Sequence, residues 1–283
     1  MEIIEYKYLL NSRIEAFRQQ GKTIGFVPTM GALHKGHLSL VERAGVKSDI
    51  VVVSIFVNPS QFNNTDDLKK YPRNLQQDIE MLEKSPCNVV FAPSVEEIYP
   101  EQDTRIFDFG YLDKVMEGLF RPGHFNGVAQ VVTKLFDIVK PNKVFFGEKD
   151  FQQLAIIRDL SKRYYPEIEI IACPIVREEN GLAMSSRNKL LSEEMRQKAA
   201  IISQTLFESC IFAKSNEIEL TKKFVIEKIN TVKELKMEYF EIIDGNRLQA
   251  VNAWNKCNYI VGCIAVYAEN IRLIDNVIYK NIL

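Results

Sequence analysis

Two histidines in one short Gly-rich segment are the first sign of chemistry in this sequence. The segment reads Pro-Thr-Met-Gly-Ala-Leu-His-Lys-Gly-His over residues 28–37, and it follows directly on a short predicted strand. The free N–H groups at the start of a helix, together with the positive end of its dipole, attract anions such as phosphate. A helix predicted over residues 36–47 begins inside this segment. We therefore expect His34 and His37 to donate hydrogen bonds to phosphate oxygens.

The same histidines admit two other interpretations. Each can be an ordinary surface or capping residue. Alternatively, His34 and His37 can bind a metal ion together with His124, although no acidic or cysteine ligand accompanies them at helical spacing. The chain has 3 histidines, and the third also lies in a Gly-rich segment, which favours a shared functional site.

A second polar cluster follows the most apolar run of the chain. The run Ile50–Val57 is rich in β-branched residues and predicts a strand that is buried on both faces. Asn58 and Gln61 come after it, at the carboxyl end, where open α/β sheets bind their ligands. Their amides suit hydroxyl groups and a carboxylate. The alternative is that Asn58 and the proline after it simply make a turn.

Cations stand beside two further predicted helix starts. Arg121 and His124 lie in a loop that leads into a predicted helix, and Lys149 follows a short predicted strand. Arginine and histidine at the mouth of a helix suit an anionic ligand. A flexible lysine at the carboxyl end of a strand can reach phosphate oxygens. A plain loop, or a helix cap at Asp150, is the structural alternative.

A third polar loop combines hydroxyl groups with a guanidinium. Ser185, Ser186 and Arg187 can cradle a polyphosphate, although such a loop is commonly just polar. The sequence has no G-x-S-x-G elbow, no P-loop and no G-x-G-x-x-G after a strand. The sequence therefore predicts a site that binds several phosphate groups at the starts of helices and has no covalent nucleophile.

The elements that position these segments change in character along the chain. Over the first part, short apolar runs alternate with helical patterns, which predicts βαβ units and a parallel sheet covered on both faces. The predicted strands are 23–27, 50–57, 88–92, 143–146 and 168–172, and the predicted helices are 36–47, 72–84, 127–139 and 151–164. Beyond about residue 176, helices from 192 and over 220–235 precede strands at 237–243, 259–266 and 273–279. This second pattern predicts a smaller α+β domain.

Composition excludes several classes of function. The chain has 283 residues, of which 46% are hydrophobic and 26% charged, which is typical of globular proteins. Its net charge of −1 gives no overall field for nucleic acid, so we expect no nucleic-acid partner. No apolar run reaches the roughly 18–20 residues of a spanning helix, so we expect no membrane association. The 5 cysteines form no C-x-x-C pair, and no signal peptide is visible, which predicts a cytoplasmic location.

Six motifs make the chain resemble the pantoate–β-alanine ligase family. They stand in the order and spacing of that family and read PTMGALHKGH, SIFVNPSQF, YPRNLQQD, RPGHFNGV, FGEKDFQQ and MSSRN. The resemblance covers nearly the whole chain and ends with RLIDN at Arg272–Asn276. His-x-Gly-His alone would mark only the wider nucleotidyltransferase superfamily, which includes class I aminoacyl-tRNA synthetases.

The resemblance implies an α/β fold and a two-step reaction. Residues 1–175 would form a Rossmann-type domain that binds ATP and pantoate, and residues 176–283 a smaller C-terminal lid, in a homodimer. The substrates would be ATP, pantoate and β-alanine, with Mg²⁺ accompanying ATP and no organic cofactor. The pantoate carboxylate would attack the α-phosphate to give pantoyl adenylate and pyrophosphate. The amine of β-alanine would then displace AMP and form pantothenate, a precursor of coenzyme A.

The site residues that the resemblance implies fall into groups. The catalytic residues would be His37, His34, Lys149 and Arg187. The ATP site would consist of Met30, Gly31, Ala32, Leu33, His34, Lys35, Gly36, His37, Gly147, Glu148, Lys149, Asp150, Val176, Met184, Ser185, Ser186 and Arg187. Pantoate and β-alanine would meet Gln61, Gln153, Asn58, Arg121 and His124. Asp78 is added as a candidate ligand of the Mg²⁺ that accompanies ATP.

Two positions depart from the family pattern, and other functions stay open. Ser60 stands where Met or Thr is more usual, and Gln130 stands where Thr is expected. One alternative function is an adenylyltransferase of the same superfamily, which would need no amine. Another is a nucleotide-binding regulatory module without catalysis. A tRNA synthetase is disfavoured because the sequence shows no anticodon domain and no basic surface.

Overall fold

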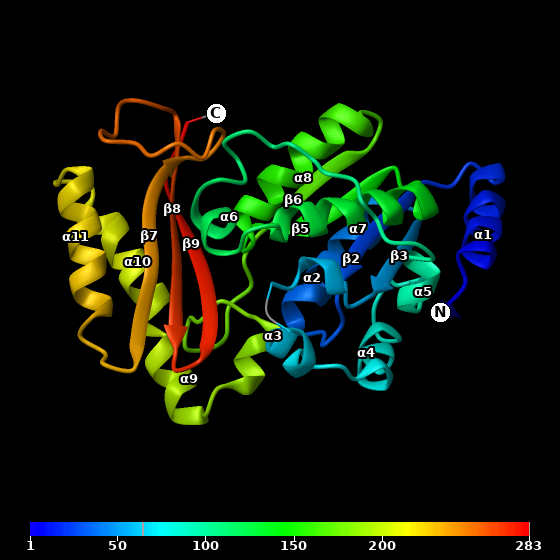
Figure 1. Ribbon diagram of the computed structural model, residues 1–283, viewed down its shortest axis with the longest axis horizontal. Coiled ribbons are helices and arrows are strands. Elements are labelled where there is room, and N and C mark those ends of the chain that lie inside the picture. Colours follow the sequence, from blue (N-terminus) through cyan, green and yellow to red (C-terminus); the bar gives the residue numbers. More distant parts are fainter. Residues whose placement is uncertain (64, 283) are drawn as a thin grey trace. The chain divides into compact units, whose positions relative to one another are not determined.

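The short β-branched runs of the first part of the chain form the parallel sheet that they predict. In the computed structural model, which describes residues 1–63 and 65–282, six strands pair in the order β1-β4-β3-β2-β5-β6, and every pair is parallel (Figure 1). The strands are β1 (Glu2–Ile4), β2 (Ile24–Thr29), β3 (Ile50–Ile55), β4 (Val89–Phe91), β5 (Lys143–Gly147) and β6 (Glu169–Cys173). The chain runs outward from β2 through β3 to β4, and then returns to β5 on the other side of β2. Ligands of open α/β sheets bind at such a switch point, outside the carboxyl ends of the strands.

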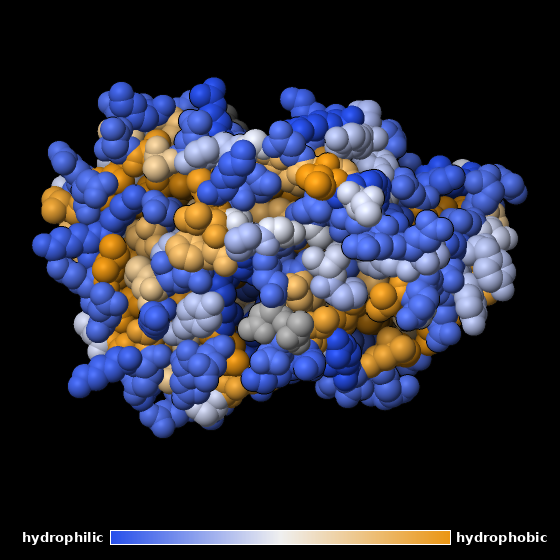
Figure 2. Space-filling model, in the orientation of Figure 1, coloured by the Kyte–Doolittle hydropathy of each residue, from blue (hydrophilic) through white to orange (hydrophobic). Residues whose placement is uncertain are grey.

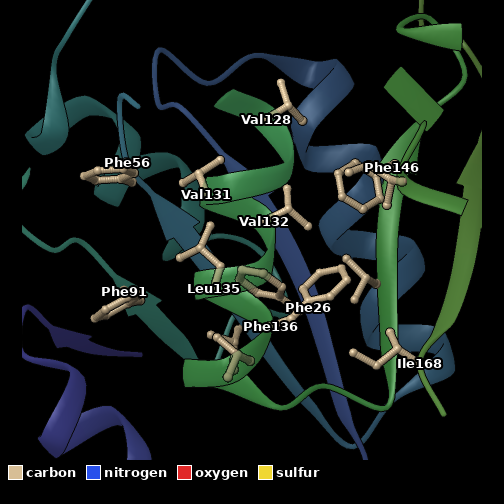
Figure 3. Close-up of a cluster of buried hydrophobic side chains, with 14 of the residues drawn as sticks. Phe26, Phe56, Phe91, Val128, Val131, Val132, Leu135, Phe136, Phe146 and Ile168 are labelled. Atoms are coloured by element: carbon tan, nitrogen blue, oxygen red, sulfur yellow. The ribbon is translucent and has the colours of Figure 1, made fainter. Parts of the chain in front are cut away.

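Helices connect these strands and cover both faces of the sheet. They are α1 (Lys7–Gln19), α2 (Lys35–Lys47), α3 (Thr65–Lys70), α4 (Leu75–Leu82), α5 (Val95–Ile98), α6 (Met116–Phe120), α7 (His124–Val139) and α8 (Phe151–Tyr164), with a short 3₁₀ helix η1 (Pro59–Gln61). Side chains alternate between the two faces along a strand. Accordingly, Val52 of β3 packs into one buried cluster with α7, and Val53 packs into another with α2. Figure 3 shows side chains of α7 gathered around Phe26 and Phe146 in the first cluster.

The later part of the chain forms a separate antiparallel sheet. Its strands β7 (Leu235–Asp244), β8 (Tyr259–Ala268) and β9 (Ile271–Asn281) pair in the order β7-β8-β9. The helices are α9 (Glu193–Ala199), α10 (Ile201–Phe212) and α11 (Ile218–Ile229), preceded by a 3₁₀ helix η2 (Ser186–Leu190). Figure 1 shows α10 and α11 beside this sheet, and apolar residues of both helices share one buried cluster with the strands. Ser192 caps α9, as predicted, because its hydroxyl accepts a hydrogen bond from the Met195 N–H at 3.1 Å.

The chain divides into two compact units. The N-terminal unit comprises Met1–Asp113, Glu117–Glu148 and Gln153–Pro174, and the C-terminal unit comprises Lys114–Met116, Lys149–Gln152 and Ile175–Leu283. Two short segments from the first part of the chain thus belong to the C-terminal unit. The predicted fold class is confirmed, with a parallel sheet between helices and a smaller α+β part.

Some elements differ from the sequence-based expectation. Strand β1 and helix α1 lie outside the elements predicted from the sequence, because β1 is only 3 residues long and α1 buries only Leu10 and Ile14. Helix α7 begins at His124 and not at Gly127, after Gly123 turns the chain with a φ of +80°. Helix α11 ends at Ile229, earlier than predicted, and strand β7 starts soon after it.

The face of the molecule drawn in Figure 2 is mostly polar. Hydrophilic residues cover much of the face seen in Figure 2, with smaller apolar areas between them. Among the described residues, no helix is both long and apolar enough to cross a membrane.

Candidate active site at the carboxyl edge of the parallel sheet

The loop after β2 is held in an unusual conformation by its own backbone amides. Gly31 and Ala32 have φ values of +78° and +49°. The Gly31 N–H donates to the Thr29 hydroxyl at 3.2 Å, and the next two amides, of Ala32 and Leu33, donate to the two carboxylate oxygens of Asp78 at 2.9 and 2.7 Å. A Cβ at Gly31 would lie 2.9 Å from the nearer of those oxygens, so glycine is required there. Three successive amides therefore fix the path of the loop.

Asp78 is a buried residue whose contacts the sequence analysis did not anticipate. It lies on α4 and is 2% exposed. Hydrogen bonds from two neutral amides to one carboxylate are strong, since the acceptor is charged. The geometry gives Asp78 a role in shaping the loop that ends at His34, and its role as a Mg²⁺ ligand stays a prediction.

His34 and His37 lie at the start of α2, as the sequence predicts. His34 is the N-cap residue, and its Nδ1 accepts a hydrogen bond from the Gly36 N–H at 3.1 Å. The capping interpretation is thus confirmed for His34, and the Gly36 amide already has an acceptor within the chain. With Nδ1 as acceptor, Nε2 is the nitrogen of the neutral ring that carries the proton and can donate to an anion. The rings of His34 and His37 lie 4.1 Å apart between centroids, so the two side chains contact each other.

The third histidine, His124, makes its ring contacts within the protein. His124 is 6% exposed, and its Nδ1 donates to the Gln61 carbonyl oxygen at 2.8 Å. Its Nε2 lies 3.1 Å from Arg121 Nη1, which can only donate. Both ring nitrogens are therefore engaged within the protein. No group of three or more His, Cys, Asp or Glu in the described part of the chain is arranged to hold a metal ion, which excludes the three-histidine site there.

Gln61 is oriented by buried partners. The Asn58 amide donates to Gln61 Oε1 at 3.1 Å and to the Gly127 carbonyl at 3.0 Å, and it accepts from the Tyr99 hydroxyl at 2.9 Å. Because Oε1 of Gln61 accepts from Asn58, its Nε2 points the other way and lies 3.1 Å from Met30 Sδ. The sheet thus brings Gln61 to the loop after β2, and the amide is held in one orientation.

Asn58 and Arg121, expected to meet pantoate or β-alanine, also have partners inside the protein. Asn58 is 1% exposed and caps η1, so the turn interpretation is confirmed alongside its contact to Gln61. Arg121 lies 3.6 Å from a carboxylate oxygen of Glu117, in addition to its contact with His124. Asn58 and His124 hydrogen-bond to Gln61, and Arg121 contacts His124. Direct contact of these three residues with substrate stays a prediction.

The two departures from the family pattern have clear contacts. The Ser60 hydroxyl donates to Asn58 Oδ1 at 3.0 Å and so joins the group that orients Gln61. Gln130 donates from Nε2 to the carbonyl oxygens of Asp103 and Arg105 at 3.0 and 2.9 Å. Gln130 therefore ties the segment before α6 to helix α7.

The segment after β5 is shared between the two units. Because β5 pairs in parallel with β2, Gly147 ends at the same edge of the sheet as the loop that carries the histidines. The Glu148 N–H donates to the Cys173 carbonyl oxygen at 2.8 Å. Lys149 and Asp150 belong to the C-terminal unit, with 3.8 Å between the Lys149 ammonium and an Asp150 carboxylate oxygen. Gln153 returns to the N-terminal unit.

The remaining predicted ATP-site residues lie together in the C-terminal unit. The Met184 N–H donates to the Val176 carbonyl at 3.0 Å, so these two residues are neighbours across a short hairpin. Ser185 caps η2 by accepting from the Arg187 N–H at 3.3 Å. The structure thus places Val176 beside Met184, at the start of the segment Met184–Arg187, on a different unit from His34 and His37, and the contact of these residues with ATP stays a prediction.

Cysteine chemistry has little support in the structure. Burial raises the pKa of the Cys87 thiol to about 12 and that of Cys173 to about 11, so both stay protonated at neutral pH. Burial also raises the pKa of Cys210 and Cys257. A protonated thiol is a poor nucleophile, so Cys87 and Cys173 have little nucleophilic character at neutral pH.

Comparison with known proteins identifies the family. The family model described as "Pantoate-beta-alanine ligase" matches residues 2–278. A pantothenate synthetase of Phocaeicola vulgatus is 58% identical over 99% of this chain and 100% of its own length. One from Porphyromonas gingivalis strain W83 is 50% identical over the same shares of both chains.

Solved structures agree with this result. The pantothenate synthetase of Thermus thermophilus superposes with a TM-score of 0.93 at 38% identity, covering 99% of this chain and 100% of its own. The pantoate–β-alanine ligase of Francisella tularensis, solved in complex with "Beta-gamma ATP" and β-alanine, gives a TM-score of 0.82 at 38% identity and covers 99% and 98% of the two chains. The motifs, the fold and these relatives agree, and the chain is an enzyme that belongs to the pantoate–β-alanine ligase family.

Proposed function

We propose that this enzyme joins pantoate to β-alanine in two steps that use ATP. The pantoate carboxylate attacks the α-phosphorus of ATP, which forms pantoyl adenylate and releases pyrophosphate. The β-alanine amine then attacks the acyl carbon, which forms the amide of pantothenate and releases AMP. Family membership and the ATP-type and β-alanine ligands of the Francisella tularensis relative support these substrates.

One observation carries the proposal. The loop with His34 and His37 follows the central strand β2, where the order of strand addition along the chain reverses, beside the end of β5. A helix start at the carboxyl edge of a parallel sheet is a place that favours phosphate binding, and His34 and His37 lie at this one. Gln61, fixed beside Met30, supplies an oriented amide for a second substrate at that edge.

The first step needs charge neutralisation more than proton transfer. The attacking carboxylate and the departing pyrophosphate are both anions, so hydrogen-bond donors and cations must lower their repulsion. We assign this task to His34 and His37 and, from the C-terminal unit, to Lys149 and Arg187. Since the leaving group gains charge as the bond breaks, contacts to it strengthen in the transition state and raise the rate.

The side-chain amides of two glutamines are proposed to bind pantoate. Gln61 and Gln153 can donate to and accept from the hydroxyl groups of pantoate and so aim its carboxylate at the α-phosphorus. Asn58 and His124 would act through Gln61, which they hold from opposite ends. The adenylate is reactive toward water, and we propose that the C-terminal unit serves as a lid that excludes water.

Mg²⁺ is expected to arrive with ATP, where it neutralises phosphate charge. Mg²⁺ usually keeps several waters and binds through substrate phosphates and one or two carboxylates. Both oxygens of Asp78, the candidate ligand, already accept amides of the loop after β2. We therefore propose that the ATP phosphates and water supply most of the ligands of Mg²⁺ and that Asp78 shapes the loop. A homodimer and a cytoplasmic location remain predictions.

An isotope experiment tests the adenylate. Pantoate labelled with ¹⁸O in its carboxylate is incubated with ATP, Mg²⁺, β-alanine and the enzyme, and the AMP formed is analysed by mass spectrometry. If the carboxylate attacks the α-phosphorus, one labelled oxygen leaves with AMP when the amine displaces it. Unlabelled AMP, or formation of ADP with labelled phosphate, would contradict the proposed intermediate.

A further inference from the structure

Two adjacent polar residues are buried in the last strand of the C-terminal sheet. Asp275 and Asn276 belong to the RLIDN motif, and they are 4% and 5% exposed. Their neighbours Leu273 and Val277 belong to the apolar core of that unit. Burying polar side chains costs free energy unless they have partners, so the partners show what these residues do.

Asn276 holds the backbone of the segment that carries the catalytic lysine. Its Nδ2 donates to the carbonyl oxygen of Lys149 at 3.1 Å, across 127 positions of sequence. Two more contacts fasten the same segment within the C-terminal unit. Phe151 packs edge-on against the ring of Tyr259 at 6.1 Å between centroids, and Gln152 donates to the Val115 carbonyl at 2.9 Å.

Asp275 holds the hairpin that leads to the serine-rich loop. Its two carboxylate oxygens accept hydrogen bonds from the Arg177 guanidinium at 2.6 and 3.0 Å. The same guanidinium donates to the Gly181 carbonyl at 3.2 Å, inside the hairpin that pairs Arg177 with Ala183. The chain continues from there into Met184–Arg187. Two neighbouring residues of β9 thus hold the two segments of this unit that we propose to bind phosphate, the one with Lys149 and the one with Met184–Arg187.

We infer that Asn276 is a positioning residue for Lys149 in the adenylate-forming step, an inference that rests on the proposed role of Lys149. A lysine side chain has many rotamers, so the position and direction of its backbone decide where the ammonium can reach. The hydrogen bond from Asn276 fixes that backbone to the strand beside the one that bears Tyr259. A misplacement of about 1 Å can cost on the order of 10²-fold in rate.

The first experiment replaces Asn276 and measures single-turnover pyrophosphate release from ATP and pantoate. Asn276→Ala removes the hydrogen-bond donor. We expect pyrophosphate release to slow by about 10–100-fold, because the backbone of Lys149 is no longer held in place. We expect the dissociation constant of ATP to change by less than about threefold, because contacts that strengthen only in the transition state contribute little to ground-state binding. Asn281→Ala, at an exposed position of the same strand, is the matched control and should leave the rate unchanged.

A double-mutant cycle with Lys149→Ala separates the inference from the proposed function. If Asn276 acts through Lys149, then Asn276→Ala slows pyrophosphate release in the native background and has no further effect once Lys149 is alanine. Additive losses, or a native rate in Asn276→Ala, would overturn the inference. An unchanged rate in Lys149→Ala alone would instead overturn the proposed role of the lysine.

Thermal unfolding shows whether each variant is folded before its rate is compared. If Asn276→Ala does not fold, Asn276→Ser is taken through the same cycle, because its shorter side chain keeps a polar group but cannot span the distance to the Lys149 carbonyl. An additive result with the serine variant contradicts the inference in the same way. Loss of the Asn276 effect in the Lys149→Ala background supports it.

Discussion

At the scale of single residues, buried polar side chains account for the geometry of the site. Ala32 has a positive φ, which is uncommon for a residue with a Cβ. The two hydrogen bonds from Ala32 and Leu33 to Asp78 oppose the cost of that conformation. Hydrogen bonds to a charged acceptor contribute about 1.5–3 kcal/mol each, which is enough to hold one unfavourable residue. The position of His34 therefore depends on a carboxylate from another helix.

Replacing Asp78 tests this dependence. In Asp78→Asn, one side-chain atom becomes an N–H donor that faces a backbone N–H, so one of the two hydrogen bonds is lost. We expect kcat/KM for ATP to fall by about tenfold or more, as the loss of about 1.5 kcal/mol or more implies. We also expect faster hydrogen exchange at the Ala32 and Leu33 amides in the protein without ligand.

The control and the metal dependence distinguish shaping of the loop from ligation. Glu80→Gln changes an exposed carboxylate on the same helix and should behave like the unmodified enzyme. The Mg²⁺ concentration that gives half-maximal activity should be the same with and without Asp78→Asn. Recovery of activity at high Mg²⁺ or Mn²⁺ would instead identify Asp78 as a metal ligand.

At the scale of elements, the close packing of η1 against α7 determines the position of Gln61. A Cβ at Gly127 would lie 2.3 Å from the Ser60 carbonyl oxygen and 2.8 Å from Gln61 Cα. The Gly127 carbonyl also accepts a hydrogen bond from Asn58. The glycine thus lets the helix approach the turn closely enough for both contacts.

Gly127→Ala tests whether this approach matters. Overpacking costs about 1–3 kcal/mol, and the atoms in the way are backbone that cannot rotate aside. We expect this cost to outweigh the roughly 1 kcal/mol that alanine gains as a helix former, so the unfolding temperature should fall. We further expect a higher KM for pantoate with little change in the KM for ATP. Native stability together with a native KM for pantoate would contradict this account.

The elements of the parallel sheet were largely predictable, because their signals are local. Ile50–Val57 is rich in β-branched residues, and strand β3 lies inside it. Helix α1 was missed because only Leu10 and Ile14 of its residues are buried, which leaves a weak apolar pattern. Helix α7 begins earlier than expected because Gly123 takes a left-handed conformation that residue type alone does not reveal.

The contacts that complete the site were not predictable from spacing. Asp78 meets Ala32 across 46 positions of sequence, and His124 meets the Gln61 carbonyl across 63 positions. Such pairs form only once the sheet has brought its loops to one edge. The sequence identified the residues that bear chemical groups, and the structure shows which of them hold others in place.

At the scale of the whole molecule, the predicted site residues divide between two units. His34, His37 and Gln61 belong to the N-terminal unit, whereas Lys149 and Arg187 belong to the C-terminal unit. The proposed role of the C-terminal unit as a lid would shield a water-sensitive intermediate.

The measurement that tests the central claim most directly is AMP release from ATP and pantoate, with and without β-alanine. The account predicts that AMP release at steady state depends on β-alanine and that one pantothenate forms for each AMP. Pyrophosphate release that turns over without any amine would contradict it and identify an adenylyltransferase that acts on another acceptor. Tight ATP binding without any turnover would also contradict it and indicate a nucleotide-binding regulatory protein.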